Sequence, residues 1–339
     1  MASLPVALIV PEAMQRKPDA PYTKILVEAG FEIRYPRNPT FPRGIGGEGE
    51  TIHELQGIHA VLAGGGEHYT AEALSALPEL RVIARSGVGY DRVDVDAATR
   101  QGIAVCITPT ANHEAVAEHA LALLLALAKN VVHNDQLVRS GGWRTTINRP
   151  LRGRTLGLVG LGRIGRSLAV RARALGMGVV TFETRPDTPF VERHQIEVVS
   201  FERLLDVSDV VSVHCPLCDE TRGLFDAKAF ARMKHGSLFL NTARGGVVVE
   251  SDLLEALRSG HLGGAGLDVY QVEPTTADNP LFRLDNVVLS PHIASGDTLA
   301  MENMGIEAAR CMARLLHNDW PEGAVVNDEL RDTWQWPTQ

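Results

Sequence analysis

Ionisable side chains stand where several short apolar runs of the sequence end, and their types suit work on a small anion and a proton. His214, Arg244 and His292 each follow such a run, and Asp268 and Glu273 lie at the end of another run and just beyond it. Histidine exchanges a proton near neutral pH, and a neighbouring carboxylate favours its charged form, which pairs Glu273 with His292. A guanidinium binds carboxylates and developing alkoxides, and only Arg244 among these residues supplies one. This set suits hydride transfer between an alcohol and a ketone.

Each member of this set also has an ordinary structural explanation when it is taken singly. Arg244 suits a surface cation, Glu273 a solvated acid and His292 a turn histidine. Their joint occurrence is more informative, because the ligands of open parallel sheets bind beyond the carboxyl ends of the strands. We therefore treat Arg244, Glu273 and His292 as the candidate catalytic residues.

A glycine-rich turn over residues 160–165, with the sequence GLGRIG, predicts a dinucleotide site. It directly follows an apolar run and opens a segment with helical apolar spacing, which is the context that makes the motif specific. Gly160 permits a tight turn, Gly162 lets the backbone approach a pyrophosphate, and Gly165 allows close helix packing. The free N–H groups of the helix N-terminus bind the phosphates.

The choice between NAD and NADP depends on the end of the next apolar run. Glu183 stands there, eighteen residues beyond Gly165, where an acid that holds the ribose hydroxyls is expected. A carboxylate repels a 2'-phosphate, so NAD is expected in preference to NADP. Arg185, two residues further on, would tolerate that phosphate, which keeps NADP as the alternative.

The elements that must position these residues alternate between strand and helix along the whole chain. Strands are expected at Val6–Val10, Phe31–Tyr35, Ile58–Ala63, Leu80–Ala84 and Ile103–Cys106, then at Thr155–Val159, Val179–Glu183, Val210–His214, Leu238–Asn241, Ala265–Val269 and Val287–Ser290. This alternation predicts an α/β fold with two doubly wound parallel-sheet domains. Helical spacing predicts helices over residues 114–128 and 297–317, and the first of these is too short to span a bilayer. The segment Pro36 to Glu50 is expected to be a mobile surface loop that carries no chemistry.

Composition narrows the class of protein. The 339 residues exceed the usual size of one domain, and 45% of them are hydrophobic, so two packed cores are expected. The formal net charge is −8 and the basic residues are scattered, which argues against nucleic acid or an anionic membrane as partner. The N-terminal run Ala2 to Val10 is interpreted as a first strand and not as a signal peptide. Four dispersed cysteines suit a reducing cytoplasm, and the Cys215 and Cys218 pair is interpreted as incidental, so no metal site is predicted.

These motifs together resemble those of the D-isomer-specific 2-hydroxyacid dehydrogenase family, which includes phosphoglycerate, glyoxylate and hydroxypyruvate dehydrogenases or reductases. The resemblance spans nearly the whole chain. Its motifs are Arg85–Asp91 (RSGVGYD), Asn112 with Val116–Glu118, the turn 160–165, His214–Leu217 (HCPL), Asn241–Gly245 (NTARG), Asp268–Val269, Glu273–Pro274 and Pro291–His292.

The resemblance implies a role for each matching residue. It assigns Arg244 to substrate binding, His292 to acid–base catalysis and Glu273 as the partner of His292. It also implies that Val88 and Gly89 present backbone N–H groups to the substrate carboxylate. Cofactor contacts are expected at Gly160, Gly162, Arg163, Ile164, Gly165, Glu183, His214, Pro216, Thr242, Ala243 and Asp268. The last three of these are expected to lie against the nicotinamide.

The resemblance further implies a division of labour between two domains. Residues 1–107 and 300–339 would form a flavodoxin-like substrate domain, and residues 108–299 a Rossmann NAD-binding domain. A homodimer built around the helix 114–128 is expected, since a helix that is apolar on nearly every side must be buried by something.

The expected activity is that of an NAD-dependent D-2-hydroxyacid dehydrogenase (EC 1.1.1 class). The turn Ala63–Glu67 (AGGGE) lacks the Arg that phosphoglycerate-specific relatives use for a phosphate, so a small keto acid of the glyoxylate or hydroxypyruvate type is expected. The alternative is an NAD-sensing, corepressor-like binding protein with little turnover, because a shared fold does not by itself establish catalysis.

Overall fold

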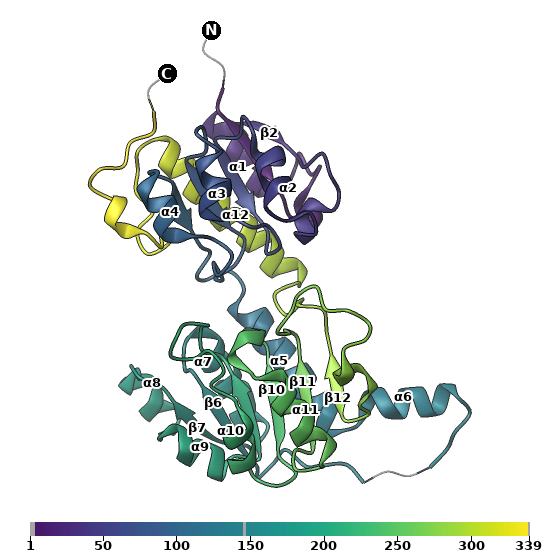
Figure 1. Ribbon diagram of the computed structural model, residues 1–339. Coiled ribbons are helices and arrows are strands. Elements are labelled where there is room, and N and C mark those ends of the chain that lie inside the picture. Colours follow the sequence, from purple (N-terminus) through teal and green to yellow (C-terminus); the bar gives the residue numbers. More distant parts are fainter. Residues whose placement is uncertain (1–3, 145–146, 338–339) are drawn as a thin grey trace. The chain divides into compact units, whose positions relative to one another are not determined.

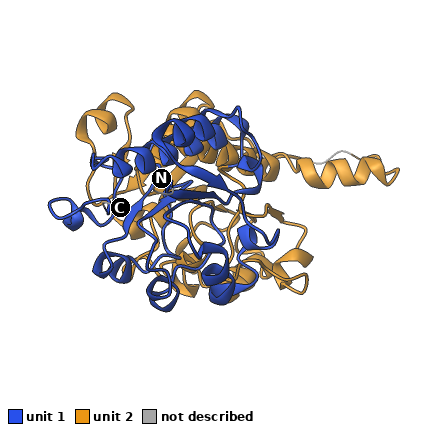
Figure 2. Cartoon of the chain, turned by 90° about the horizontal axis from the view of Figure 1, so that it is seen from above, with its two compact units in different colours: residues 1–112, 296–339 blue, residues 113–295 orange. Residues whose placement is uncertain are grey.

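In the computed structural model, which describes residues 4–144 and 147–337, the chain forms two compact units. Unit 1 comprises residues 1–112 and 296–339, and unit 2 comprises residues 113–295 (Figure 2). Ala2, where the first apolar run was expected to begin, lies outside the described residues, as do the predicted domain limits at residues 1 and 339. Each unit is built on its own parallel sheet.

Five parallel strands form the sheet of unit 1 in the order β2-β1-β3-β4-β5. They are β1 (Val6–Ile9), β2 (Glu32–Arg34), β3 (Ala60–Ala63), β4 (Val82–Arg85) and β5 (Ala104–Cys106). All five predicted strands are confirmed. This order is that of the flavodoxin-like doubly wound fold.

Helices cover both faces of the unit 1 sheet, which explains why its strands are continuous apolar runs. In β1, Ala7 and Ile9 pack into the cluster formed with α1 (Pro21–Ala29) and α12 (Thr298–Leu316). Val6 and Leu8 point to the opposite face, since side chains alternate along a strand. That face is covered by α2 (Gly47–Leu55), α3 (Ala71–Ser75) and α4 (Val95–Arg100). The short helices η1 (Glu12–Met14) and η5 (Asp328–Leu330) complete the unit.

The prediction of a surface loop over Pro36 to Glu50 is wrong. This segment contains the short helix η2 (Phe41–Arg43) and the beginning of α2, and the side chain of Phe41 is only 1% exposed. Gly44 is needed for close packing, because a Cβ at this position would lie 1.9 Å from the carbonyl oxygen of Gly66. Burial of Phe41 and this contact stabilise a structure that glycine and proline content alone disfavours.

Seven parallel strands form the sheet of unit 2 in the order β12-β11-β10-β9-β6-β7-β8. They are β6 (Thr155–Val159), β7 (Gly178–Phe182), β8 (Glu197–Val198), β9 (Val210–Val213), β10 (Leu238–Asn241), β11 (Gly264–Leu267) and β12 (Val287–Leu289). Six were predicted. The seventh, β8, was missed because it is a two-residue edge strand with both residues exposed. The chain reverses its direction of winding between β6 and β9, as in dinucleotide-binding folds.

Two helical layers cover the unit 2 sheet. α5 (His113–Ala128) and α7 (Arg163–Ala174) pack against one face, and α9 (Phe201–Val207), α10 (Ala227–Arg232) and α11 (Glu250–Arg258) against the other. The remaining helices are α6 (Val131–Arg139), α8 (Thr188–Arg193), η3 (Gly245–Val247) and η4 (Pro280–Arg283). The predicted helices at residues 114–128 and 297–317 are therefore confirmed as α5 and α12.

Helix α6 differs from the other helices of unit 2. It extends away from the body of the unit in both views (Figures 1 and 2), and none of its residues is buried. Within the described part of the chain, no single helix is long and apolar enough to cross a membrane. α5 and α6 taken together meet the length and composition, but they are bent by 58° where they join.

Candidate active site

The predicted ionisable residues of unit 2 gather where its strands end. His214 follows β9, Arg244 follows β10, Asp268 follows β11, and His292 follows β12. These four strands are parallel and adjacent in the sheet, so their carboxyl ends lie along the same edge. Glu273 lies five residues beyond Asp268 on the loop after β11.

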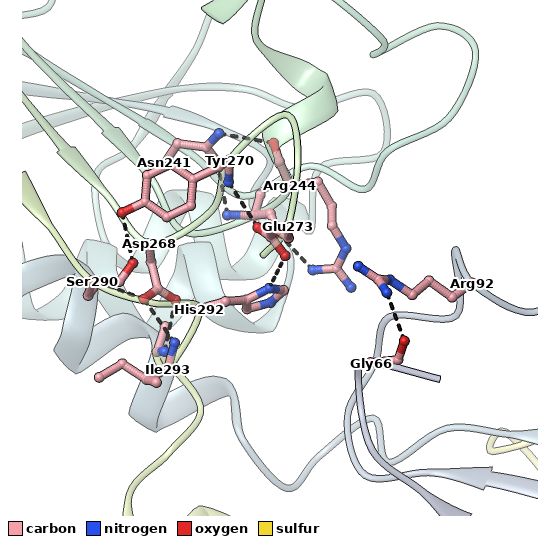
Figure 3. A network of polar contacts seen from close by, with 12 residues as sticks. Gly66, Arg92, Asn241, Arg244, Asp268, Tyr270, Glu273, Ser290, His292 and Ile293 are labelled. Atoms are coloured by element: carbon pink, nitrogen blue, oxygen red, sulfur yellow. Dashed lines mark hydrogen bonds and ion pairs between the residues drawn. The ribbon is translucent and has the colours of Figure 1, made fainter. Parts of the chain in front are cut away.

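The ring of His292 and the carboxylate of Glu273 point toward each other (Figure 3). Nδ1 of His292 donates to Oε2 of Glu273 over 2.7 Å, and the backbone N–H of Tyr270 donates to Oε1 over 2.9 Å. Burial raises the pKa of Glu273, but the bond from His292, the backbone bond and the charge of Arg244 together bring that pKa below its ordinary value. Glu273 is therefore ionised at neutral pH, and its bond directs Nε2 of His292 away from the carboxylate.

Asp268 holds the backbone on which His292 stands. It is fully buried, its Oδ1 accepts from Ser290 and from the N–H of Ile293, and its Oδ2 accepts from the N–H of Ala294. The N–H of His292 donates to the carbonyl oxygen of Asp268 over 2.8 Å. These bonds maintain His292 at φ 54°, a left-handed conformation that is uncommon outside glycine. The predicted contact of Asp268 with a nicotinamide stays a prediction.

Sequence reasoning missed His119 as part of this arrangement. It lies on α5, with Nε2 at 2.8 Å from the hydroxyl of Ser290 and 3.6 Å from Oδ1 of Asp268. The hydroxyl of Tyr270 donates to the carbonyl oxygen of Ser290, and burial, with the charges of Asp268 and Glu273, raises the pKa of Tyr270 to about 12. A polar pair, Glu118 and His119, within the most apolar helix was the signal available in the sequence.

Arg244 is positioned by a short polar turn after β10. The side-chain amide of Asn241 donates to the carbonyl oxygen of Arg244 over 3.0 Å and accepts from the N–H of Ala243 over 3.0 Å. The next residue must be glycine, because a Cβ on Gly245 would lie 1.8 Å from the carbonyl oxygen of Tyr270. The guanidinium donates to the carbonyl oxygen of Ala243, and its charge acts on Glu273. The structure thus brings Arg244, Glu273 and His292 into one electrostatic group.

The glycine turn before α7 fits the pyrophosphate of a dinucleotide. Gly160 has φ 101°, and a Cβ on Gly165 would lie 2.3 Å from the carbonyl oxygen of Gly160. A Cβ on Gly162 meets no atom within 4 Å, so the space over Gly162 is open. No side chain of the described residues caps the N-terminus of α7, which leaves its first N–H groups for an anion. Arg163 and Ile164 form the first turn of α7.

Glu183 is held against this turn. Its Oε2 accepts from the N–H of Leu161 over 2.7 Å, and its Oε1 accepts from the N–H of Arg185 over 3.0 Å. Burial raises the pKa of Glu183, but these backbone bonds outweigh it, so the pKa lies below its ordinary value. A fixed negative charge therefore lies beside the turn at the end of β7.

The other residues expected to bind the cofactor differ in burial and in hydrogen bonding. Nε2 of His214 lies 2.8 Å from the hydroxyl of Ser212, and desolvation of the ring lowers the pKa of His214 to about 4, so this imidazole is neutral. The hydroxyl of Thr242 is buried and has no hydrogen-bond partner in the described part of the chain, and a bound ligand would supply one. Pro216 is exposed, and Ala243 is half-buried.

The expected substrate residues Val88 and Gly89 belong to unit 1, in the turn that follows β4. Neither of their N–H groups donates to an acceptor within the described residues. Glu67 and Arg85, both buried, form an ion pair beside this turn, a contact that residue spacing does not reveal.

Within residues 4–144 and 147–337, no three His, Cys, Asp or Glu side chains gather in a way that could hold a metal ion. Cys215 is a poor ligand, because burial raises the pKa of its thiol to about 11.

Comparisons with known proteins find similar sequences over most of the chain. A family model described as "D-isomer specific 2-hydroxyacid dehydrogenase, NAD binding domain" matches residues 121–294. The chain is 41% identical to the D-3-phosphoglycerate dehydrogenase of Mycobacterium leprae over 77% of its own length and 51% of that relative. It is 40% identical to the glyoxylate reductase of Korarchaeum cryptofilum, over 77% of this chain and 80% of that one. The chain thus spans about half the length of the phosphoglycerate dehydrogenases that it matches.

A solved structure agrees with the fold. The D-lactate dehydrogenase of Aquifex aeolicus, determined in complex with NAD and lactic acid, superimposes with a TM-score of 0.81 at 27% identity. The match covers 94% of this chain and 98% of that one. The predicted fold, a flavodoxin-like domain with a Rossmann domain, is therefore confirmed.

Proposed function

Because the chain belongs to the D-isomer-specific 2-hydroxyacid dehydrogenase family, we propose that it moves a hydride between NAD(H) and C2 of a small D-2-hydroxy or 2-keto acid. We propose that it acts as a reductase of 2-keto acids of the glyoxylate or hydroxypyruvate type. The observation that carries this proposal is the 2.7 Å bond between His292 and Glu273, with Arg244 acting on the same carboxylate.

His292 is the proton donor in keto-acid reduction. Its Nδ1 is held by Glu273, so the proton that moves is the one on Nε2. The side chain of His292 is 45% exposed, and its Nε2 has no hydrogen-bond partner among the described residues. A substrate oxygen therefore has access to Nε2. Glu273, ionised and fixed by the N–H of Tyr270, holds the ring of His292 in its orientation.

Arg244 binds the substrate and neutralises the charge that develops on its carbonyl oxygen. A guanidinium presents several N–H donors in one plane, which matches both a carboxylate and an alkoxide. We assign Val88 and Gly89 to the substrate carboxylate through their unused N–H groups. When a reduced nicotinamide dinucleotide is bound, it supplies the hydride that C2 receives.

We assign the cofactor site to the turn 160–165 and its neighbours. The N-terminus of α7 receives the pyrophosphate over the open space at Gly162. Glu183 accepts the ribose hydroxyls and repels a 2'-phosphate, which supports NAD in preference to NADP. The buried hydroxyl of Thr242 gains a partner from the bound cofactor. Arg163, Ile164, His214, Pro216, Ala243 and Asp268 complete the proposed set.

We propose that residues 1–107 and 300–339 form the substrate domain and residues 108–299 the cofactor domain. A homodimer through α5 is proposed, with α6 as a second contact. Helix α6 exposes three apolar side chains, Val131, Val132 and Val138, which are 53%, 44% and 56% exposed. An exposed apolar surface of this kind is typical of a protein–protein contact. All four cysteines are free thiols, in keeping with a proposed cytoplasmic location.

The experiment that tests the function is a steady-state assay of NADH oxidation. Glyoxylate, hydroxypyruvate, pyruvate, phenylpyruvate and 3-phosphohydroxypyruvate are compared, and each is repeated with NADPH. We expect the highest kcat/KM with NADH and a small unphosphorylated acid. Negligible turnover with every acid, together with tight NADH binding, would instead support a binding protein.

A further inference from the structure

A buried ion pair lies behind the turn that follows β4 in unit 1. Glu67 is fully buried and Arg85 is 7% exposed, and NH1 of Arg85 lies 3.5 Å from Oε2 of Glu67. Burial of a charge is costly unless another charge and hydrogen bonds compensate it. Burial does raise the pKa of Glu67, and the charge of Arg85 opposes that rise. Because a buried ion pair contributes little net stability, we expect this pair to position other groups.

The remaining bonds of the pair reach two separate stretches of backbone. Nε of Arg85 donates to the carbonyl oxygen of Gly89 over 3.0 Å. Oε1 of Glu67 accepts from the N–H of Gly64 over 2.9 Å. The pair thus connects the glycine turn after β3 with the far end of the turn after β4.

Within residues 4–144 and 147–337, the bond from Arg85 is the only hydrogen bond that reaches the far end of that turn, Val88 and Gly89. Its near end is held, because Ser86 donates to the carbonyl oxygen of Ala63 through both its N–H and its hydroxyl. Gly87 has φ 149°, and its carbonyl oxygen accepts from the N–H of Thr108. Val88, by contrast, is 38% exposed, so apolar packing does not fix its peptide.

We propose that Glu67 is a positioning residue for substrate binding. Acting through Arg85, it fixes the carbonyl group of Gly89 and thereby the direction of the N–H groups of Val88 and Gly89. This inference rests on the proposed function, in which those two N–H groups bind the substrate carboxylate. Glu67 itself does not touch the substrate, since it is enclosed in unit 1.

The test compares two buried carboxylates of unit 1. Glu67→Gln removes the charge that holds Arg85 and keeps the size of the side chain. Glu54→Gln is the matched control, because Glu54 is 5% exposed and accepts backbone N–H groups from Arg37 and Asn38, remote in sequence from the turn. Both variants lose one buried charge, but only Glu67→Gln loses the link to Gly89.

We expect Glu67→Gln to raise KM for the keto acid by about 10- to 100-fold while kcat changes less than about threefold, since the loss is in binding geometry. The affinity for NADH should be unchanged. Glu54→Gln should leave KM within about twofold of the wild type. An unchanged KM in folded Glu67→Gln, or an equal rise in both variants, would overturn the proposal.

A second measurement does not depend on activity. Amide hydrogen exchange of residues 86–90 should rise by at least about tenfold in Glu67→Gln and in Arg85→Lys, and remain unchanged in Glu54→Gln. Unchanged exchange in both turn variants would overturn the positioning role. If the wild-type protein reduces no keto acid, the proposed function fails, whereas the exchange result still decides whether the pair fixes the turn.

Discussion

Nδ1 of His292 donates to Oε2 of Glu273 over 2.7 Å, although nineteen residues separate the two in sequence. Glu273 lies on the loop after β11 and His292 three residues after the end of β12, and the pairing of these parallel strands brings the two loops together. Because Nδ1 is engaged, the opposite nitrogen of the ring is the one that can exchange a proton with a substrate. The roles of the two residues follow from this asymmetry.

Replacement of His292 removes the proposed proton donor and leaves the cofactor turn intact. His292→Ala should lower kcat by about 100- to 10,000-fold with little change in NADH affinity. Steady-state kinetics and NADH fluorescence titration measure the two quantities. His261→Ala, which alters a histidine bonded to the carbonyl oxygen of Met233, is the control and should keep its activity. Wild-type turnover in His292→Ala would exclude His292 from the mechanism.

Replacement of Glu273 should lower the rate of the reaction. Burial raises the pKa of Glu273, but the bond from His292 helps to bring it below its ordinary value, so the carboxylate is charged throughout the assay range. Glu273→Gln keeps the size of the side chain but replaces a charge-assisted bond to Nδ1 of His292 with a weaker neutral one. The kcat of keto-acid reduction should therefore fall by about 10- to 100-fold, while the affinity for NADH is unchanged. A kcat in Glu273→Gln equal to that of the wild type would contradict this role.

The charge of Glu183 should decide between the two nicotinamide cofactors. Glu183→Gln can still accept the N–H of Leu161 but no longer repels a 2'-phosphate. The ratio of kcat/KM for NADH to that for NADPH should fall by about 10- to 100-fold. Glu220→Gln, at an exposed acid of the same unit, serves as the control. A ratio that stays constant in Glu183→Gln would remove Glu183 from cofactor selection.

Two glycines of the cofactor turn should respond differently to the same substitution. A Cβ at Gly162 enters open space, so Gly162→Ala should keep the wild-type Tm but weaken NADH binding by about tenfold or more, since the methyl group occupies the pyrophosphate side. Gly165→Ala should lower Tm as well, because its Cβ meets the carbonyl oxygen of Gly160. Calorimetry and NADH titration of both variants separate the effects. Tight NADH binding by Gly162→Ala would place the pyrophosphate elsewhere.

Local patterns in the sequence were sufficient to predict most of the fold. Continuous apolar runs predicted eleven of the twelve strands, because strands covered on both faces are apolar throughout. The edge strand β8 has no such pattern. The segment of η2 and α2 was also missed, since its structure depends on the burial of Phe41 and not on local preference.

The main residues of the candidate site were also predictable from the sequence. Strand-end position and residue type indicated Arg244, Glu273 and His292, and the structure brings these three together. The supporting contacts were not visible in the sequence. The bond from His119 to Ser290 and the pairing of Glu67 with Arg85 depend on tertiary distances that residue spacing does not encode.

The most direct test of the central claim is the transfer of a deuteride from cofactor to substrate. NADH carrying deuterium at the transferable C4 position is incubated with the best keto acid of the panel other than glyoxylate, whose reduction product is not a D- or L-acid, and the product is analysed by NMR and by chiral chromatography. We expect one deuterium at C2 of a D-2-hydroxy acid, formed in equal amount to the NADH consumed. Product without deuterium from either C4-labelled form of NADH, or an L-2-hydroxy acid, would contradict it.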